Sequence, residues 1–153
     1  MDNVDFNFMT LAVLEAEAAM LRGDVPVGAV LVRDGEVLAA GSNTKTIDPT
    51  AHAEIQVIRA GAERLGNWNL RECDLYVTLE PCAMCAGACV ASRIRAIIFG
   101  SSDPRAGAVG TLYDIPSDRR LNHRCAVRSG MLKERCEALL KEYFIIRRKT
   151  KSG

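Results

Sequence analysis

The stretches TAHAEI (residues 50–55) and TLEPCAMC (residues 78–85) contain the chain's strongest candidates for metal ligands. The first holds His52, and the second holds Cys82 and Cys85 behind a proline. Both stretches are expected where a helix begins, and the positive end of a helix stabilises thiolates. Side chains three positions apart share one helix face, so both cysteines can contact the same ion. Two thiolates and an imidazole form the soft, tetrahedral donor set typical of zinc.

The residue two positions after the histidine, Glu54, predicts what such a site would do. Three protein ligands leave a fourth tetrahedral position open for water. Zinc lowers the pKa of a bound water from ~15.7 towards ~7, which gives hydroxide at neutral pH. Glu54 is poorly placed to join the ligands but can stand beside the water. We therefore expect Glu54 to act as a proton shuttle rather than as a ligand.

Two other interpretations of these cysteines stay open at this point. A structural zinc site would need a fourth protein ligand, and His123 is the remaining histidine. Alternatively, the C-x-x-C pair could be a redox pair. The other four cysteines are expected to be packing residues, because a free cysteine behaves as a small apolar side chain. They are Cys73, Cys89, Cys125 and Cys136.

The pattern of apolar residues predicts one domain, residues 1–153, built from five strands and four helices. The expected strands are residues 27–32, 36–41, 75–79, 95–100 and 125–130. The expected helices are residues 6–22, 51–65, 81–92 and 131–146. Thr50 is expected to cap the second helix, and Pro81 to occupy the first turn of the third. Two strands followed by helix–strand–helix–strand predict a sheet flanked by helices.

Composition excludes several classes of protein. With 153 residues, of which 48% are hydrophobic and 25% charged, the chain is neither disordered nor a coiled coil. No apolar run approaches the ~18 residues of a membrane-spanning helix, so no membrane partner is expected. The first residues are acidic rather than basic, which is unlike a signal peptide. We therefore expect a cytoplasmic protein with reduced cysteines.

The net charge of +1 hides an asymmetry along the chain. Residues 1–80 carry 6 Lys/Arg against 13 Asp/Glu, whereas residues 81–153 carry 14 against 6. A basic half favours a polyanionic partner such as RNA. The alternative is that the opposite charges pair across one domain. The densest basic run, RRKTK (147–151), is expected either to contact RNA or to be a frayed terminus.

The order H-A-E, then P-C-x-x-C, resembles the zinc-dependent cytidine deaminase superfamily. Further stretches are similar to the bacterial tRNA-specific adenosine deaminase family and cover nearly the whole chain. They are VPVGAVLV (25–32), GSN (41–43), DPTAHAEI (48–55), LYVTLEPCAMCAGA (75–88), FGSSDPRAGAVG (99–110), LNHR (121–124) and FIIRR (144–148). The resemblance implies a three-layer α/β/α fold with a central five-stranded mixed sheet. It also implies a homodimer that binds a tRNA anticodon stem-loop and converts the wobble adenosine to inosine.

The resemblance also implies a role for individual residues. His52, Cys82 and Cys85 would bind one zinc ion, and Glu54 would move protons. The implied substrate contacts are Asn43 and the backbone near Ala53 to the flipped base, Asp103 and Arg105 along the anticodon loop, Asn122 and His123 at a nearby nucleotide, and Phe144, Arg147 and Arg148 at flanking nucleotides and phosphates.

This chain departs from the family pattern at the residues that flank Asp103. Ser101-Ser102 stands where Ala-Arg is common, and Arg105 replaces a frequent lysine, which keeps the charge but changes its geometry. Two rival functions remain: a deaminase for free guanine or another free base or nucleoside, and a non-catalytic RNA-binding module stabilised by zinc. The first shares the zinc chemistry, and the second requires His123 as a fourth ligand.

Overall fold

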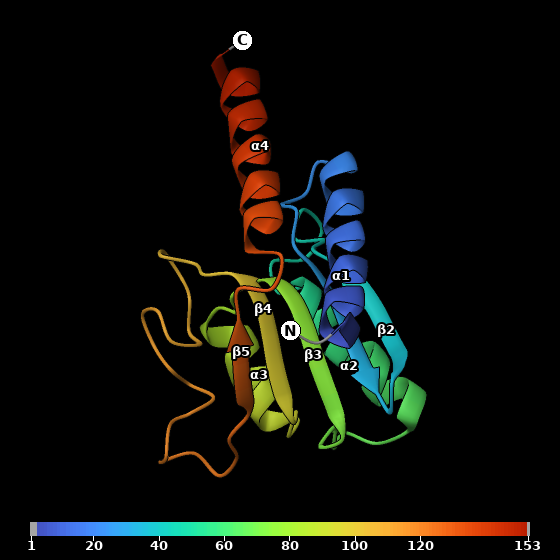
Figure 1. Ribbon diagram of the computed structural model, residues 1–153. Coiled ribbons are helices and arrows are strands. Elements are labelled where there is room, and N and C mark those ends of the chain that lie inside the picture. The colour runs from blue at the N-terminus through green and yellow to red at the C-terminus, as the bar shows by residue number, and fades with distance from the viewer. Residues whose placement is uncertain (1–2, 153) are drawn as a thin grey trace.

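A five-stranded mixed sheet lies between two pairs of helices (Figure 1). The computed structural model describes residues 3–152, and the side chains of residues 3–150. The strands are β1 (Gly28–Arg33), β2 (Glu36–Ser42), β3 (Cys73–Leu79), β4 (Ala96–Ser101) and β5 (Ala126–Ser129). The helices are α1 (Asn3–Leu21), α2 (Ala53–Leu65), α3 (Ala83–Ala91) and α4 (Lys133–Ser152). The predicted α/β/α arrangement and its five strands are confirmed.

The sheet order β2-β1-β3-β4-β5 follows from short local connections. β1 and β2 form an antiparallel hairpin whose two turn residues, Asp34 and Gly35, have φ values of 51° and 76°. Two left-handed residues match the right-handed twist of the strands they join. β1 also pairs antiparallel with β3, whereas β3, β4 and β5 run parallel. The parallel pair β3–β4 requires a crossover, which α3 supplies.

Side chains alternate between the two faces of the sheet, and each face packs on one pair of helices. On one face, Leu31 of β1 belongs to a buried cluster with Val57 of α2 and Ala86 of α3. On the other face, Val30 of β1 belongs to a cluster with Met9 of α1. Figure 1 shows α1 and α4 on one side of the sheet and α2 and α3 on the other. Because helices cover both faces, the six residues of β4 are all buried.

A buried ionic network ties the N-terminal helix to the sheet. Asp5 of α1 is 7% exposed and accepts hydrogen bonds from the Tyr76 hydroxyl and from the Arg128 guanidinium. Burial raises the pKa of the Tyr76 hydroxyl, and its hydrogen bond to Asp5 raises it further. The network connects α1, β3 and β5, which are far apart in the sequence.

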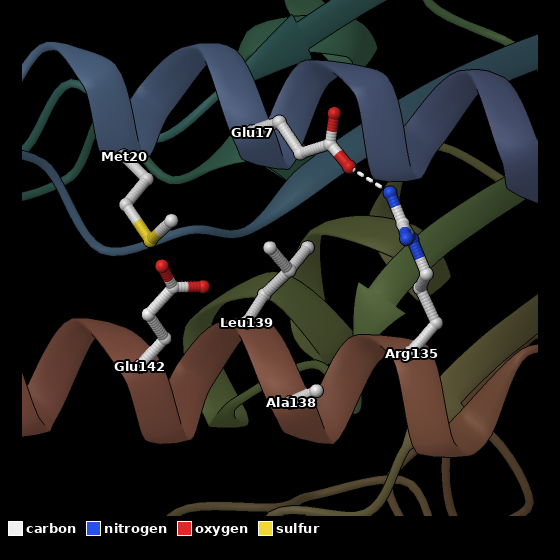
Figure 2. A pocket seen from close by; sticks show the side chains of 6 residues that line it. All are labelled: Glu17, Met20, Arg135, Ala138, Leu139 and Glu142. Atoms are coloured by element: carbon white, nitrogen blue, oxygen red, sulfur yellow. Dashed lines mark hydrogen bonds and ion pairs between the residues drawn. The ribbon is translucent and has the colours of Figure 1, made fainter.

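Helix α4 packs on α1 along its first half only. Arg135 forms an ion pair with Glu17 of α1, and Leu139 lies beside them in a groove of about 300 Å³ (Figure 2). The second half extends beyond the sheet (Figure 1). The predicted end at residue 146 is wrong, because the basic run 147–151 continues the helix. Within this half, Arg147 donates a hydrogen bond to the Tyr143 hydroxyl one turn earlier, at 3.1 Å.

The predicted starts of two helices are also wrong. Thr50 does not cap α2; its hydroxyl and its N–H both donate to the side chain of Asp48, and the N-cap is His52. Pro81 precedes α3 rather than entering its first turn, and the N-cap is Cys82. In both cases the residue at the cap is a candidate metal ligand. Among the described residues, no helix is both long and apolar enough to cross a membrane.

The contact between β1 and α1 predicts a sensitive position. A Cβ atom on Gly28 would lie 2.0 Å from the Ala12 carbonyl oxygen and 2.5 Å from the Ala16 nitrogen, both backbone atoms of α1. We expect Gly28→Ala to lower the free energy of unfolding by about 3 kcal/mol, because the helix must move away. Urea denaturation measures the change.

A second glycine provides the control for this measurement. A Cβ on Gly87, in α3, would meet no atom within 4 Å. Replacing a helical glycine by alanine in open space stabilises by roughly 0.5–1 kcal/mol. Equal unfolding midpoints for Gly28→Ala and the wild type would show that α1 does not pack as described.

Candidate metal centre

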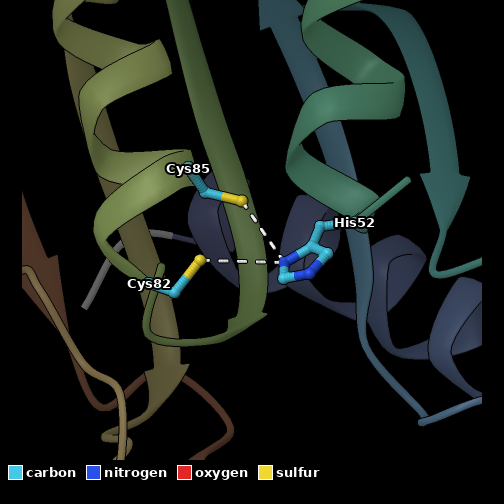
Figure 3. A group of neighbouring side chains, drawn as sticks. All are labelled: His52, Cys82 and Cys85. Carbon is cyan, nitrogen blue, oxygen red and sulfur yellow. Dashed lines mark hydrogen bonds between the residues drawn. The ribbon is translucent and has the colours of Figure 1, made fainter. Parts of the chain in front are cut away.

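The side chains of His52, Cys82 and Cys85 meet where α2 and α3 begin (Figure 3). His52 and Cys82 are the N-cap residues of the two helices and have extended backbones, so their side chains project ahead of the helix. Cys85 lies in the first turn of α3. The His52 Nδ1 atom is 3.7 Å from the Cys82 sulfur and 3.6 Å from the Cys85 sulfur. The segments that lead into α2 and α3 therefore bring three soft donor atoms to one point.

The spacing of these atoms fits zinc. Zn–S bonds of about 2.3 Å and Zn–N bonds of about 2.0–2.1 Å at tetrahedral angles place nitrogen and sulfur about 3.6 Å apart. The two measured N···S separations agree with this value. Among the described residues, this group has three members, which leaves one tetrahedral position for a further ligand. The donor set and its geometry both match an open zinc site.

The remaining histidine does not close the site. The His123 Nε2 atom lies 2.7 Å from the carbonyl oxygen of Ile94, which follows the C-terminal end of α3. Cys82 stands at the other end of that helix. The structural-zinc interpretation, which requires His123 as a fourth ligand, therefore has no support in the structure.

The electrostatics of the group favour a thiolate. Hydrogen bonds from Cys85 and then from His52 lower the pKa of the Cys82 thiol to about 3. The hydrogen bond to Cys82 in turn raises the pKa of His52. The pKa of Cys85 rises, because its proton is held by Cys82 and its thiol is buried. One negative sulfur is thus already stabilised at this end of α3, as expected at a helix N-terminus.

Glu54 lies beside the group, in the first turn of α2. Its side chain is buried, with 3% of the residue exposed, and burial raises the pKa of its carboxyl to about 7. A hydrogen bond with Cys85 partly opposes this rise. A carboxyl with a pKa near neutrality can both accept and release a proton. Glu54 is not part of the ligand group, and its role as a proton shuttle stays a prediction.

Asn43 is held against the start of α2. Its side-chain oxygen accepts a hydrogen bond of 2.8 Å from the Ala53 N–H, and the residue is 5% exposed. The Arg22 guanidinium donates a hydrogen bond to the backbone carbonyl oxygen of Asn43. Because the side-chain oxygen is engaged, the Asn43 amide nitrogen is the group left to bind a substrate. The Ala53 N–H is engaged within the protein, and its contact with a base stays a prediction.

The loop after β4, residues 102–111, also reaches the metal group. Its Ala108 N–H donates to the carbonyl oxygen of Pro81, next to Cys82, at 2.9 Å. Asp103 accepts hydrogen bonds from the N–H groups of Arg105 and Ala106. The hydrogen bond from Ala108 places part of this loop beside Pro81, and the expected contacts of Asp103 and Arg105 with the anticodon loop stay predictions.

Five of the expected RNA contacts lie elsewhere. Phe144, Arg147 and Arg148 are on the projecting half of α4, and the other two, Asn122 and His123, follow α3 in the chain. Asn122 accepts a hydrogen bond from Arg93 at 3.2 Å, beside His123 and Ile94. This is the opposite end of α3 from Cys82, about 13 Å away for a helix of nine residues. Within one chain, Asn122 and His123 do not join the metal group.

Glu80 was missed by the sequence reasoning. It is 2% exposed and lies between β3 and Pro81, with its carboxylate beside loop 102–111. Burial alone would raise its pKa, but hydrogen bonds from Thr111 and from backbone N–H groups lower it. A charged residue directly after the apolar run LYVTL (75–79) is the signal that could have identified it.

The family follows from the comparison with known proteins. The model for the cytidine and deoxycytidylate deaminase zinc-binding region matches residues 2–101. The chain is 44% identical over 148 residues to the tRNA-specific adenosine deaminase of Bacillus subtilis (strain 168), which covers 95% of this chain and 92% of that protein. This chain belongs to the tRNA-specific adenosine deaminase family. The matched region is a zinc-binding one, and the group of His52, Cys82 and Cys85 fits one zinc ion.

Two solved structures place this member of the deaminase family more finely. One comes from work on A-to-I editing by tRNA:A34 deaminases at the wobble position of transfer RNA. It is 46% identical, has a TM-score of 0.84, and the match covers 88% of this chain and 99% of that one. A guanine deaminase from Bacillus subtilis is 39% identical with a TM-score of 0.62, over 69% of each chain. The fold is therefore shared with a free-base deaminase, but more of it is shared with the tRNA enzyme.

The open site makes a prediction about metal content. We expect the purified protein to hold one zinc ion per chain and His52→Ala to lose it, because two thiolates alone cannot complete the donor set. His123→Ala should keep the full amount. Elemental analysis by mass spectrometry after dialysis measures the ratio. Loss of zinc from His123→Ala would instead support a closed, structural site.

Proposed function

We propose that this protein hydrolyses adenosine to inosine at the wobble position of a tRNA anticodon loop. The observation that carries the reaction type is the three-donor metal group beside the buried Glu54. The substrate follows from the tRNA-specific relatives, with which the chain shares nearly its whole length. Residues 1–153 would act as one deaminase domain, and a tRNA substrate would place it in the cytoplasm.

The metal group would activate the water molecule that acts as the nucleophile. His52, Cys82 and Cys85 would hold the zinc ion, whose charge lowers the pKa of a water molecule in the site. Two thiolates offset the charge of the ion, so the centre as a whole is close to neutral. The helix N-termini that carry these ligands hold them in a fixed arrangement.

Glu54 would move the protons of the reaction. It takes a proton from the attacking water and delivers it to N1 of the adenine, which makes C6 more electrophilic. It would then take the proton of the hydroxyl group added at C6 and deliver it to the amino group, so that the C6–N bond breaks and the C6 carbonyl forms. Water and adenosine are consumed, and inosine and ammonia are formed. The pKa of about 7 suits a group that must gain and lose a proton in each turnover.

The base must leave its stack to reach this site. A single-stranded hairpin loop makes extrusion less costly than a duplex does. The Asn43 amide nitrogen, fixed by the bond between its oxygen and Ala53, would donate to an acceptor on the purine edge. Asp103 and Arg105 would lie along the flanking loop. These contacts would select an adenosine presented by RNA.

The basic second half of the chain would bind the RNA backbone. Phe144 is 45% exposed on the projecting half of α4, and Arg147 follows it one turn later. An exposed aromatic ring can stack on a base, and Arg147 and Arg148 can contact phosphates. Asn122 and His123 lie at the far end of α3, so their expected contact concerns a nucleotide away from the target base.

We also propose a homodimer, as the family resemblance implies. Exposed apolar side chains support it near the beginning of α3 and in the loop that follows β4. Met84 is 39% exposed, Leu112 53% and Tyr113 63%. Light scattering coupled to size exclusion would give the mass of the particle, and a monomer at micromolar concentration would contradict this part of the proposal.

The substrate class is tested by incubating the protein with RNA and with free bases or nucleosides in parallel. We expect an RNA hairpin with adenosine in a seven-membered anticodon-like loop to gain inosine, detected by mass spectrometry. Free adenosine, adenine, guanine and cytidine should stay unchanged, because only the RNA engages loop 102–111 and α4. Product from guanine alone would instead favour the free-base deaminase to which the fold is also similar.

The role of Glu54 makes a separate prediction. Glu54→Ala should lower turnover of the hairpin by about 10²–10⁴-fold, the usual contribution of general acid–base catalysis. The zinc content should stay at the wild-type value, because Glu54 is outside the ligand group. Glu63→Ala, which removes an exposed carboxylate from the same helix, is the matched control and should leave turnover unchanged. Retained turnover in Glu54→Ala would rule out its role as the proton shuttle.

A further inference from the structure

The carboxylate of Glu80 accepts every hydrogen bond that it makes from one segment, loop 102–111. The Asp103 N–H and the Thr111 hydroxyl donate to its Oε1 atom, the first at 3.0 Å. The Val109 N–H and the Thr111 N–H donate to its Oε2 atom at 2.9 and 3.1 Å. Each of the two carboxylate oxygens therefore accepts two hydrogen bonds. An ionised carboxylate can accept this many because both of its oxygens are acceptors. Hydrogen bonds to a buried carboxylate are shorter and stronger than neutral ones.

The loop passes so close to Glu80 that a side chain would not fit between them. A Cβ atom on Gly107 would lie 2.4 Å from the Glu80 carboxyl carbon. The next residue, Ala108, donates to the carbonyl oxygen of Pro81. The loop is therefore fastened to both residues that precede the candidate ligand Cys82. Glu80 itself is outside the metal group, so its contacts act on the loop.

The segment held in this way carries the expected RNA contacts. The Asp103 N–H is fixed by Glu80, and the Asp103 carboxylate in turn accepts from the N–H groups of Arg105 and Ala106. The position of Arg105 therefore depends on Glu80 through Asp103. Arg105 is exposed and contributes to the basic half of the chain.

We propose that Glu80 is a positioning residue that holds loop 102–111 in the conformation that binds RNA beside the metal centre. This inference rests on the proposed function. If the loop populates the binding conformation only a tenth of the time, the apparent affinity for RNA falls about tenfold. The chemistry at the metal is unaffected once the RNA is bound. Glu80 would thus set the Michaelis constant and leave the turnover number largely alone.

The variants that test this proposal change the hydrogen bonds with little change of shape. Glu80→Gln replaces one acceptor oxygen by an amide that points its hydrogens at N–H donors. Thr111→Val removes only the hydroxyl donor and is the milder variant if Glu80→Gln folds poorly. Tyr76→Phe is the matched control, because it also removes a hydroxyl that donates to a buried carboxylate, Asp5, on the opposite face of the sheet.

Two readouts separate positioning from general stability. In amide hydrogen exchange, the N–H groups of Asp103, Val109 and Thr111 should exchange at least about tenfold faster in Glu80→Gln and Thr111→Val, but not in Tyr76→Phe. With the hairpin substrate, KM should rise about tenfold in the two loop variants while kcat stays within about threefold, and zinc content should not change.

The outcomes distinguish this inference from the proposed function. Hairpin affinity can be measured without turnover by placing Thr111→Val in the Glu54→Ala background and recording fluorescence anisotropy. Absence of inosine from the wild type would overturn the proposed function, whereas the exchange and binding results would still decide the role of Glu80. Loss of kcat or of zinc with an unchanged KM would overturn the positioning role, as would equal KM changes in Thr111→Val and Tyr76→Phe.

Discussion

The structure depends on two helices that begin at the same point. α2 and α3 each start with a residue whose side chain accepts no capping hydrogen bond, His52 and Cys82. A serine, threonine or aspartate at such a position typically adds about 1 kcal/mol to helix stability. His52 and Cys82 do not provide this stabilisation. Their side chains instead approach each other, and the His52 Nδ1 atom lies 3.7 Å from the Cys82 sulfur. The positive ends of both helices then favour negative charge on sulfur.

Three buried carboxylates differ in role because they differ in partners. Burial of Glu54 outweighs the hydrogen bonds and the nearby His52 that favour its charged form, so its pKa rises to about 7 and it can exchange protons. Glu80 is almost equally buried but receives four hydrogen bonds from one loop, so it holds that loop in place. Asp5 is paired with a guanidinium and a phenol, and it ties the first helix to the sheet. Burial alone therefore does not identify a catalytic acid; the number and kind of donors around the carboxylate decide.

The sequence predicted the elements and the metal group because both have local signals. Strand periodicity located β1 to β5, and ligand spacing located His52, Cys82 and Cys85. The errors arose where another contact competes with a local preference or lies far away in the sequence. Thr50 has the residue type of a cap, but its hydroxyl is used by Asp48, and the cap position falls on the ligand His52. Glu80 was not predicted because its donors come from residues 23 to 31 positions later, which no spacing rule reveals.

Substrate choice and chemistry are carried by different parts of this fold. The metal group and Glu54 sit at helix starts that are fixed by the packed sheet, and a guanine deaminase shares that frame. The burial of side chains changes along helix α4. Cys136, Leu139 and Tyr143 are buried against the body, whereas every described side chain after Tyr143, as far as residue 150, is exposed. An isolated, fully exposed helical end gains nothing from the hydrophobic core, and an enzyme for a free base does not require one. Its basic and aromatic residues suit a large and negatively charged partner such as an RNA hairpin, which agrees with the RNA substrate proposed above.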